Sequence, residues 1–251
     1  MENSSLRSPE GADSRLELLL GRDALDALAA RRVLLVGVGG VGSWCAEALV
    51  RSGVRRIALM DDDVVAPSNL NRQLHATVHA LGTRKPAAMA RRLREVVPEC
   101  ETEEIDAFFG ADSPLRLADY DLVVDAIDTL RSKTELALRA AREGVPFVSS
   151  MGAARKLDPT QVRVASIWKT DGDPLAREMR IRLRREGFSG DYPCVYSAER
   201  PVGGVIPPES APAGTLRKTV CGTAAPVVAA FGMALASVAL RLLLDLPAES
   251  R

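Results

Sequence analysis

The chain has 251 residues, of which 47% are apolar, so one large α/β domain with a sizeable core is expected and a disordered chain is excluded. The 33 Lys and Arg residues balance the 33 Asp and Glu residues. This neutrality excludes nonspecific nucleic-acid binding through excess positive charge, but it leaves room for a local basic patch.

Strands and helices are predicted to alternate through the first 152 residues. Residues 1–12 are polar and are expected to form a flexible tail. Helices are predicted over 14–30, 41–52, 84–97 and 130–143, and strands over 32–38, 56–60, 102–107, 121–127 and 145–150. This order predicts a Rossmann-like α/β fold, with a mostly parallel sheet and helices on both faces.

After Gly152 the rhythm changes, which predicts a smaller C-terminal extension with short strands and an apolar helix. A strand is expected over 161–167, a helix over 174–185, and loops with short strands over 187–220. Residues 223–240 approach membrane-spanning length, but Pro226, Gly232 and many alanines favour a buried core helix over membrane association. We expect one domain over 13–251, with a nucleotide-binding part at about 31–152 and the extension at about 153–245.

A glycine-rich segment follows the first predicted strand. Gly37, Gly39 and Gly42 have the G-x-G-x-x-G spacing, and Gly40 lies between them. The spacing suits a tight turn, a close approach of phosphate to the backbone, and packing of the next helix on the strand. Asp61 closes the second strand, where an acid can bind a ribose hydroxyl. Together these features predict a nucleotide site without distinguishing NAD, FAD or ATP.

Polar side chains gather after the second and fourth strands, at the edge of the sheet where ligands of this fold bind. Arginine suits bidentate phosphate binding, lysine adds a point charge, and an acid beside phosphates suggests a magnesium ligand. The residues concerned are Asp61, Asp63, Asn69, Asn71, Arg72, Gln73, Lys85 and Asp128.

Taken singly, these charged residues have simpler interpretations. Arg72 and Lys85 could be solvated surface charges, and Asp128 could be the N-cap of the following helix. Together, on one sheet edge, they favour a site for an enzyme that cleaves ATP. A dehydrogenase needs no such arrangement for a triphosphate.

Several motifs resemble the adenylating domain shared by ubiquitin-activating enzymes and their bacterial relatives ThiF and MoeB. These are G-V-G-G-V-G, D-D-D-V, N-L-N-R-Q, Lys85 and D-A-I-D. Further motifs resemble the branch of tRNA threonylcarbamoyladenosine dehydratases, also known as TcdA or CsdL. They are R-L-E-L-L-L-G at Arg15–Gly21, V-D-A-I-D-T at Val124–Thr129, L-D-P-T-Q-V at Leu157–Val162, K-T-D-G-D-P-L-A at Lys169–Ala176 and V-Y-S-A-E at Val195–Glu199.

The resemblance implies a cytoplasmic homodimer that uses ATP and Mg²⁺ to activate a carboxylate on tRNA, which then closes into a ring. It assigns the phosphate turn to Gly39 and Gly40, the ribose to Asp61, the phosphates to Arg72 and Lys85, the metal to Asp128, and a site across the dimer to Arg15. A sulfur-transfer or cysteine-desulfurase partner is a further expectation. Two C-x-x-C pairs, frequent in carrier-protein activators, are absent.

Three function classes stay open: a tRNA-modifying adenylating enzyme, an activator of a small sulfur-carrier protein, and an NAD-dependent oxidoreductase. Arg177, Arg180 and Arg184 share one face of the helix after Pro174, which is either solvated or a contact for tRNA phosphates. Cys221 is interpreted as structural. His75 and His79 could pair as metal ligands on a helix, but a surface or capping position is favoured.

Overall fold

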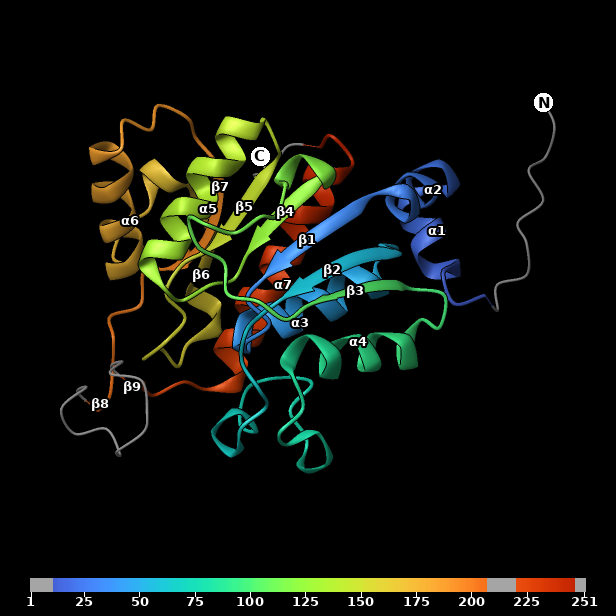
Figure 1. The fold of residues 1–251 in the computed structure, drawn as a ribbon, viewed down its shortest axis with the longest axis horizontal. Helices are drawn as coiled ribbons and strands as arrows, with labels where there is room; N and C mark the ends of the chain where they lie inside the picture. The colour runs from blue at the N-terminus through green and yellow to red at the C-terminus, as the bar shows by residue number, and fades with distance from the viewer. Residues whose placement is uncertain (1–10, 207–219, 247–251) are drawn as a thin grey trace.

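A seven-stranded sheet forms the centre of the computed structural model, which describes residues 11–206 and 220–246 (Figure 1). The strand order is β3-β2-β1-β4-β5-β7-β6, and every neighbouring pair is parallel except β6 with β7. The chain winds outward from β1 in one direction and then restarts beside it at β4, so the switch point lies between β1 and β4. The strands are β1 (Arg32–Val36), β2 (Arg56–Met60), β3 (Glu101–Ile105), β4 (Leu122–Asp125), β5 (Phe147–Ser150), β6 (Val162–Ser166) and β7 (Pro193–Ser197).

Helices cover both faces of this sheet (Figure 1). Alternate strand residues face opposite layers: Val33 and Leu35 pack with α3 (Gly40–Arg51), α4 (Lys85–Val96) and α7 (Ala225–Leu243). Leu34 and Val36 pack with α5 (Leu130–Glu143) and α6 (Pro174–Arg185). The predicted α/β class is therefore confirmed. Two short helices, α1 (Ser14–Leu20) and α2 (Arg22–Ala30), precede the sheet.

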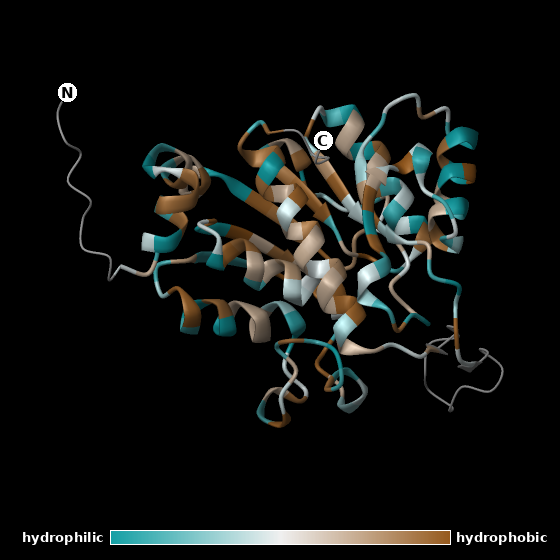
Figure 2. Ribbon diagram, turned by 180° about the vertical axis from the view of Figure 1, so that it is seen from behind, coloured by the Kyte–Doolittle hydropathy of each residue, from teal (hydrophilic) through white to brown (hydrophobic). Residues whose placement is uncertain are grey.

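The apolar segment near the C-terminus forms α7, which packs alongside α3. Among the described residues, α7 is the one helix long and apolar enough to cross a membrane. However, Val227, Phe231 and Leu235 are fully buried in the protein. A Cβ on Gly232 would lie 2.6 Å from the Trp44 Cβ, so glycine allows the two helices to approach closely. Figure 2 shows this helix from behind, coloured mostly from white to brown by hydropathy. The segment is a core helix, as the sequence favours.

The prediction of loops with short strands over 187–220 covers β7, but it does not include the place of this strand inside the main sheet. β7 joins β5 on one side and β6 on the other, and Cys194 and Val195 have no exposed surface. The strand has only five residues among glycines and prolines, so its own pattern is weak, and its place is set by pairing with β5. Residues after Gly152 thus complete the same sheet. The short pair β8 (Val205–Ile206) and β9 (Val220–Cys221) lies apart from it.

The predicted tail over residues 1–12 falls almost entirely outside the described residues.

Candidate active site

The glycine turn lies at the switch point between β1 and β4. Gly37 has φ +94°, and a Cβ there would lie 2.7 Å from the backbone of Ala126. A Cβ on Gly42 would lie 1.8 Å from the Gly37 carbonyl oxygen. Gly39, in contrast, has no atom within 4 Å of the position that a Cβ would take, so the space above it is open. Two glycines therefore let the turn fold, and the third leaves room for a ligand.

The helix α3 begins at this turn without a side-chain cap. Its N-cap is Gly39, which has no side chain that could cap the first turn. The unpaired N–H groups at the start of a helix, together with the helix dipole, favour an anion. This end of α3 therefore suits phosphate.

Asp61 follows β2 and lies against the same turn. Its Oδ2 accepts from the Val38 N–H at 2.7 Å, and its Oδ1 accepts from the Asp63 N–H at 3.0 Å. Burial raises the pKa of Asp61, and the nearby Lys85 ammonium opposes that rise. Each carboxylate oxygen can accept a further hydrogen bond. Asp61 can therefore hold the turn and still receive a ribose hydroxyl.

Lys85 lies beside these acids, and its Nζ is 2.6 Å from Asp63 Oδ2 and 3.7 Å from Asp61 Oδ1. The lysine side chain is only 7% exposed, so the surface-charge interpretation is wrong for it. Asp61, Asp62 and Asp63 together offer metal-type ligands, but the Asp61 and Asp63 oxygens already bind N–H groups or the lysine. Lys85 is thus a buried positive charge beside Asp61 and Asp63.

Arg72 crosses the start of α3 from the loop that follows β2. Its Nη1 donates to Ser68 O at 2.7 Å and to Asn71 Oδ1 at 3.0 Å. Trp44 Nε1 donates to the Arg72 carbonyl at 3.1 Å. Partial burial lowers the pKa of Arg72, and the carboxylate of Asp128 opposes that effect. The guanidinium is therefore oriented beside the glycine turn and close to Asp128.

The polar residues around Arg72 have different parts in the structure. Asn69 Oδ1 accepts from the Ala66 N–H at 2.9 Å, which shapes the loop. Asn71 Nδ2 donates to Thr223 O at 2.9 Å, which ties the loop to the segment before α7. Gln73 is buried, and its Oε1 has no hydrogen-bond partner among the described residues. Asn69 and Asn71 thus build the framework that holds Arg72.

Asp128 lies in the loop after β4, and its side chain is exposed. The N-cap of α5 is Thr129, which provides no side-chain cap, so the capping interpretation of Asp128 is wrong. Thr129 Oγ1 donates to Asp128 Oδ1 at 3.4 Å. An exposed carboxylate beside a phosphate-type site has the oxygen chemistry that Mg²⁺ prefers, so the donor set fits this ion.

Two features of the site could not be found from motifs. Thr223, in the segment before α7, contacts the site loop although 152 residues separate it from Asn71. Asp125 and Lys133 form a fully buried ion pair behind Asp128. The sequence shows the two residues as the first acid of D-A-I-D and a lysine eight positions later. It does not show that they pair, because their burial depends on how β4, β5 and α5 pack.

Arg15 lies far from this group within its own chain. It is an exposed residue of α1, and the preceding Asp13 pairs with Arg55 at 2.7 Å, immediately before β2 begins. Asp61 follows the other end of β2. Arg15 therefore belongs to the amino edge of the sheet, whereas the remaining predicted residues surround its carboxyl edge (Figure 1).

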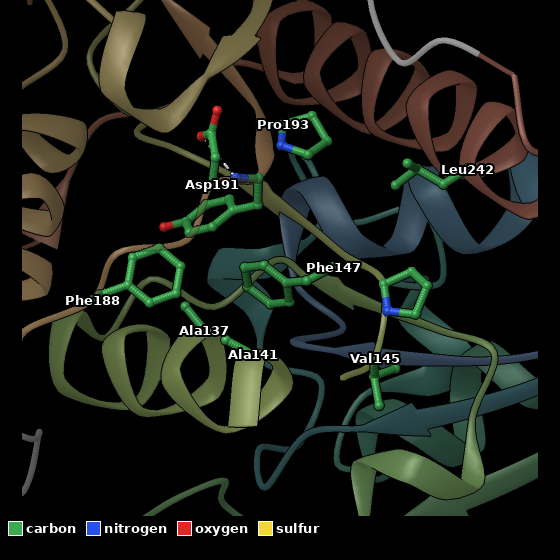
Figure 3. A pocket seen from close by; sticks show the side chains of 10 residues that line it. Ala137, Ala141, Val145, Phe147, Phe188, Asp191, Pro193 and Leu242 are labelled. Atoms are coloured by element: carbon green, nitrogen blue, oxygen red, sulfur yellow. Dashed lines mark hydrogen bonds between the residues drawn. The ribbon is translucent and has the colours of Figure 1, made fainter. Parts of the chain in front are cut away.

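A separate apolar cavity of about 240 Å³ opens near the first residues of β5 and β7 (Figure 3). Phe147, Phe188 and Pro193 line it, with Leu242 from α7. Parallel strands begin at this edge, so the cavity lies at the edge opposite the glycine turn and is not part of the candidate site.

The fold and the site together define a Rossmann-like nucleotide-binding protein with two cationic side chains, Arg72 and Lys85, near its glycine turn. A family profile described as the ThiF family matches residues 13–251, and the chain belongs to the ThiF family.

Comparisons with individual proteins indicate the branch of the family that this chain resembles. The chain is 42% identical over 191 residues to the tRNA threonylcarbamoyladenosine dehydratase of Bacillus subtilis, and the aligned region covers 75% of each chain. The crystal structure of the E. coli enzyme of this name, TcdA, in complex with ATP has a TM-score of 0.79 and 36% identity, covering 92% of this chain and 93% of that one. The molybdopterin-synthase adenylyltransferase of Escherichia coli is 31% identical over 62% of this chain and 61% of its own length. The resemblance to the dehydratase branch is therefore confirmed.

Proposed function

We propose that this protein adenylates the carboxylate of threonylcarbamoyladenosine in tRNA and then closes it into a ring, with loss of water. The carboxylate oxygen attacks the α-phosphorus of ATP and pyrophosphate leaves. An atom of the carbamoyl group then forms a bond to the activated carbonyl carbon, the carbamoyl group releases a proton, and AMP leaves with the former carboxylate oxygen. The observation that carries this proposal is Arg72 beside the glycine turn and Asp128, in a chain 42% identical to a dehydratase.

The residues of the site divide the work by charge and position. The open backbone at Gly39 and the start of α3 hold phosphate oxygens, and Asp61 accepts a ribose hydroxyl. Arg72 stabilises the negative charge that develops on phosphate during attack, and Lys85 adds positive charge from the ribose side. Asp128 would hold Mg²⁺, which when bound neutralises phosphate charge.

The decisive experiment supplies ATP, Mg²⁺ and modified tRNA, digests the tRNA, and analyses its nucleosides by mass spectrometry. We expect the modified adenosine to lose one water while AMP and pyrophosphate appear. Arg72→Ala should reduce turnover by about 10²-fold or more while the protein stays folded, since removing a transition-state donor has about this effect. An untouched nucleoside, together with adenylation of a sulfur-carrier C-terminus, would replace this function with the carrier-activating one.

We propose that the active form is a homodimer in which Arg15 reaches the site of the partner subunit. Arg15 is exposed and lies away from the site in its own chain. Leu18 and Leu19, on the same short helix, are 67% and 77% exposed. An exposed apolar pair on the arginine-bearing helix is consistent with an interface.

We also propose that the arginines of α6 contact tRNA phosphates. Arg177, Arg182, Arg184 and Arg185 are exposed, and Arg184 also lies over the Trp168 ring at 5.2 Å. Arg180 is partly buried and donates to Thr170. The helix carries one acid, Glu178, so its outer surface is locally basic in a neutral protein. A cytoplasmic location and a sulfur-transfer partner stay predictions.

A further inference from the structure

A buried polar cluster lies directly behind the loop that carries Asp128. Asp125 ends β4, and Lys133 lies one turn into α5. Neither side chain has any exposed surface, and Lys133 Nζ is 2.6 Å from Asp125 Oδ2. The cluster is therefore cut off from substrate and can act only through its neighbours.

Every donor of the buried ammonium has an acceptor. Besides Asp125, Lys133 Nζ donates to Ser149 Oγ at 3.0 Å and to Ser150 O at 2.7 Å. Ser149 Oγ in turn donates to Asp125 Oδ2 at 2.6 Å. An ammonium has three donors, so this one is fully satisfied. Lys133 thus joins α5 to the ends of two neighbouring strands.

The second oxygen of Asp125 extends the cluster to the site. Asp125 Oδ1 accepts from the Ile127 N–H at 3.0 Å. The Ala126 N–H donates to Val36 O at 2.8 Å, and a Cβ on Gly37 would lie 2.7 Å from the Ala126 backbone. The short segment between Asp125 and Asp128 is therefore held between the glycine turn and the buried carboxylate.

Stability does not account for this arrangement, because well-packed apolar residues of similar volume often stabilise a core as well as a buried ion pair does. A fixed geometry does account for it, since ligands must be held within a fraction of an ångström. We propose that Lys133 is a positioning residue, which orients Asp125 so that the loop holds Asp128 beside Arg72. This inference rests on the proposed function, in which Asp128 holds Mg²⁺.

The test variant combines Lys133→Met with Asp125→Asn. It removes both charges together, so no unpaired charge stays buried, and the new asparagine side chain keeps an oxygen that can accept from the Ile127 N–H. We expect a folded protein whose turnover falls about 10- to 100-fold and whose half-saturating Mg²⁺ concentration rises about tenfold, as for other outer-shell partners. The KM for modified tRNA should not change. Hydrogen exchange of residues 126–129 in the nucleotide-free protein should become faster.

The matched control is Lys156→Met with Asp173→Asn, because this pair is also buried, with Nζ 2.9 Å from Oδ2, but Asp173 caps α6 instead. Its Mg²⁺ dependence should equal that of the natural protein. An equal Mg²⁺ shift in the control, or unchanged turnover and exchange in the Lys133 variant, overturns the positioning role. If the natural protein leaves modified tRNA unchanged, the proposed function is rejected instead. The positioning role is then tested without tRNA, by calorimetry of ATP and Mg²⁺ binding to the natural protein and to both double variants.

Discussion

At the scale of single residues, the glycines of the phosphate turn have separable tasks. Gly42 packs against the Gly37 carbonyl, whereas Gly39 faces open space. Their G-x-G-x-x-G spacing was readable from the sequence because turn, strand end and helix start are all local. The sequence does not show which glycine is needed for the turn and which leaves space for a ligand. That depends on the atoms around each glycine, which only the three-dimensional structure shows.

We expect Gly39→Ala to fold normally but to bind ATP much more weakly, because the methyl group occupies the space above the turn. Gly42→Ala should instead lower the free energy of unfolding by several kcal/mol, because its methyl group would overlap a backbone oxygen. Chemical denaturation and calorimetry with ATP on both variants measure the two effects. Equal stabilities would contradict the division of tasks.

His75 lies in the loop between the two short 3₁₀ helices after β2, so the helical metal pair with His79, which the sequence disfavoured, does not form. The favoured surface or capping position is correct for His79, which is exposed, and wrong for His75. The imidazole is 3% exposed, and neither nitrogen has a hydrogen-bond partner among the described residues. Burial lowers the pKa of His75 to about 4, with Lys85 and Arg92 adding to the effect. The folded protein therefore keeps this imidazole neutral.

A depressed histidine pKa predicts acid sensitivity. As pH falls from about 6.5 toward 4, the unfolded chain takes up a proton that the folded chain rejects. The stability contribution, present in full above pH 6.5, is therefore lost across this window, up to about 3 kcal/mol. Urea unfolding at pH 7.0 and 4.5 measures the change. In His75→Leu, the slope of the unfolding free energy against pH should fall by the equivalent of about one proton. An unchanged slope would show that other groups cause the acid sensitivity.

At the scale of elements, the spacing of apolar residues in α6 predicts its buried side. The spacing of its arginines leaves open whether its outer side is solvated or contacts tRNA. Met179 and Leu183 are fully buried. Arg180 and Arg184, grouped with Arg177 by helical spacing, instead contact Thr170 and Trp168. The sequence therefore located the helix and its buried side, while the partners of its arginines depended on how η5 (Ile167–Lys169) packs beside it.

We expect Arg177→Gln, Arg182→Gln and Arg185→Gln together to weaken tRNA binding and to flatten the dependence of log affinity on log salt by about two to three units. ATP binding should stay unchanged. The control removes three exposed arginines elsewhere, at Arg22, Arg91 and Arg116. Filter binding at several salt concentrations compares them, and identical losses in both triple variants would rule out α6 as a specific contact.

At the scale of the whole molecule, the position of Arg15 makes a prediction about assembly. If each site needs Arg15 from the partner subunit, Arg15→Ala and Arg72→Ala proteins should both be inactive alone. After subunit exchange, half of the dimers are mixed and each has one intact site, so about a quarter of natural activity should return. Turnover of the mixture measures it, with mass spectrometry to verify exchange. Verified exchange without recovery would place Arg15 outside the active site.

The alternation of strands and helices and the edge of the sheet at which the polar side chains gather followed from the sequence, because each depends on local pattern and on the general rule for parallel sheets. The place of β7 in the main sheet and the Asp125–Lys133 pair did not follow. Both depend on contacts between segments distant in sequence, where a five-residue run or a single lysine carries no distinctive local signal.

The bond from Asn71 to Thr223 and the packing of Val228 near Gly40 also have a consequence for protein synthesis. The glycine turn leaves the ribosome well before α7, the helix that covers α3, because α7 lies much later in the chain. Until α7 emerges, the apolar face formed by α3 and the sheet has no cover. During this interval the nascent chain exposes an apolar face, and transiently exposed apolar surface of this kind promotes aggregation.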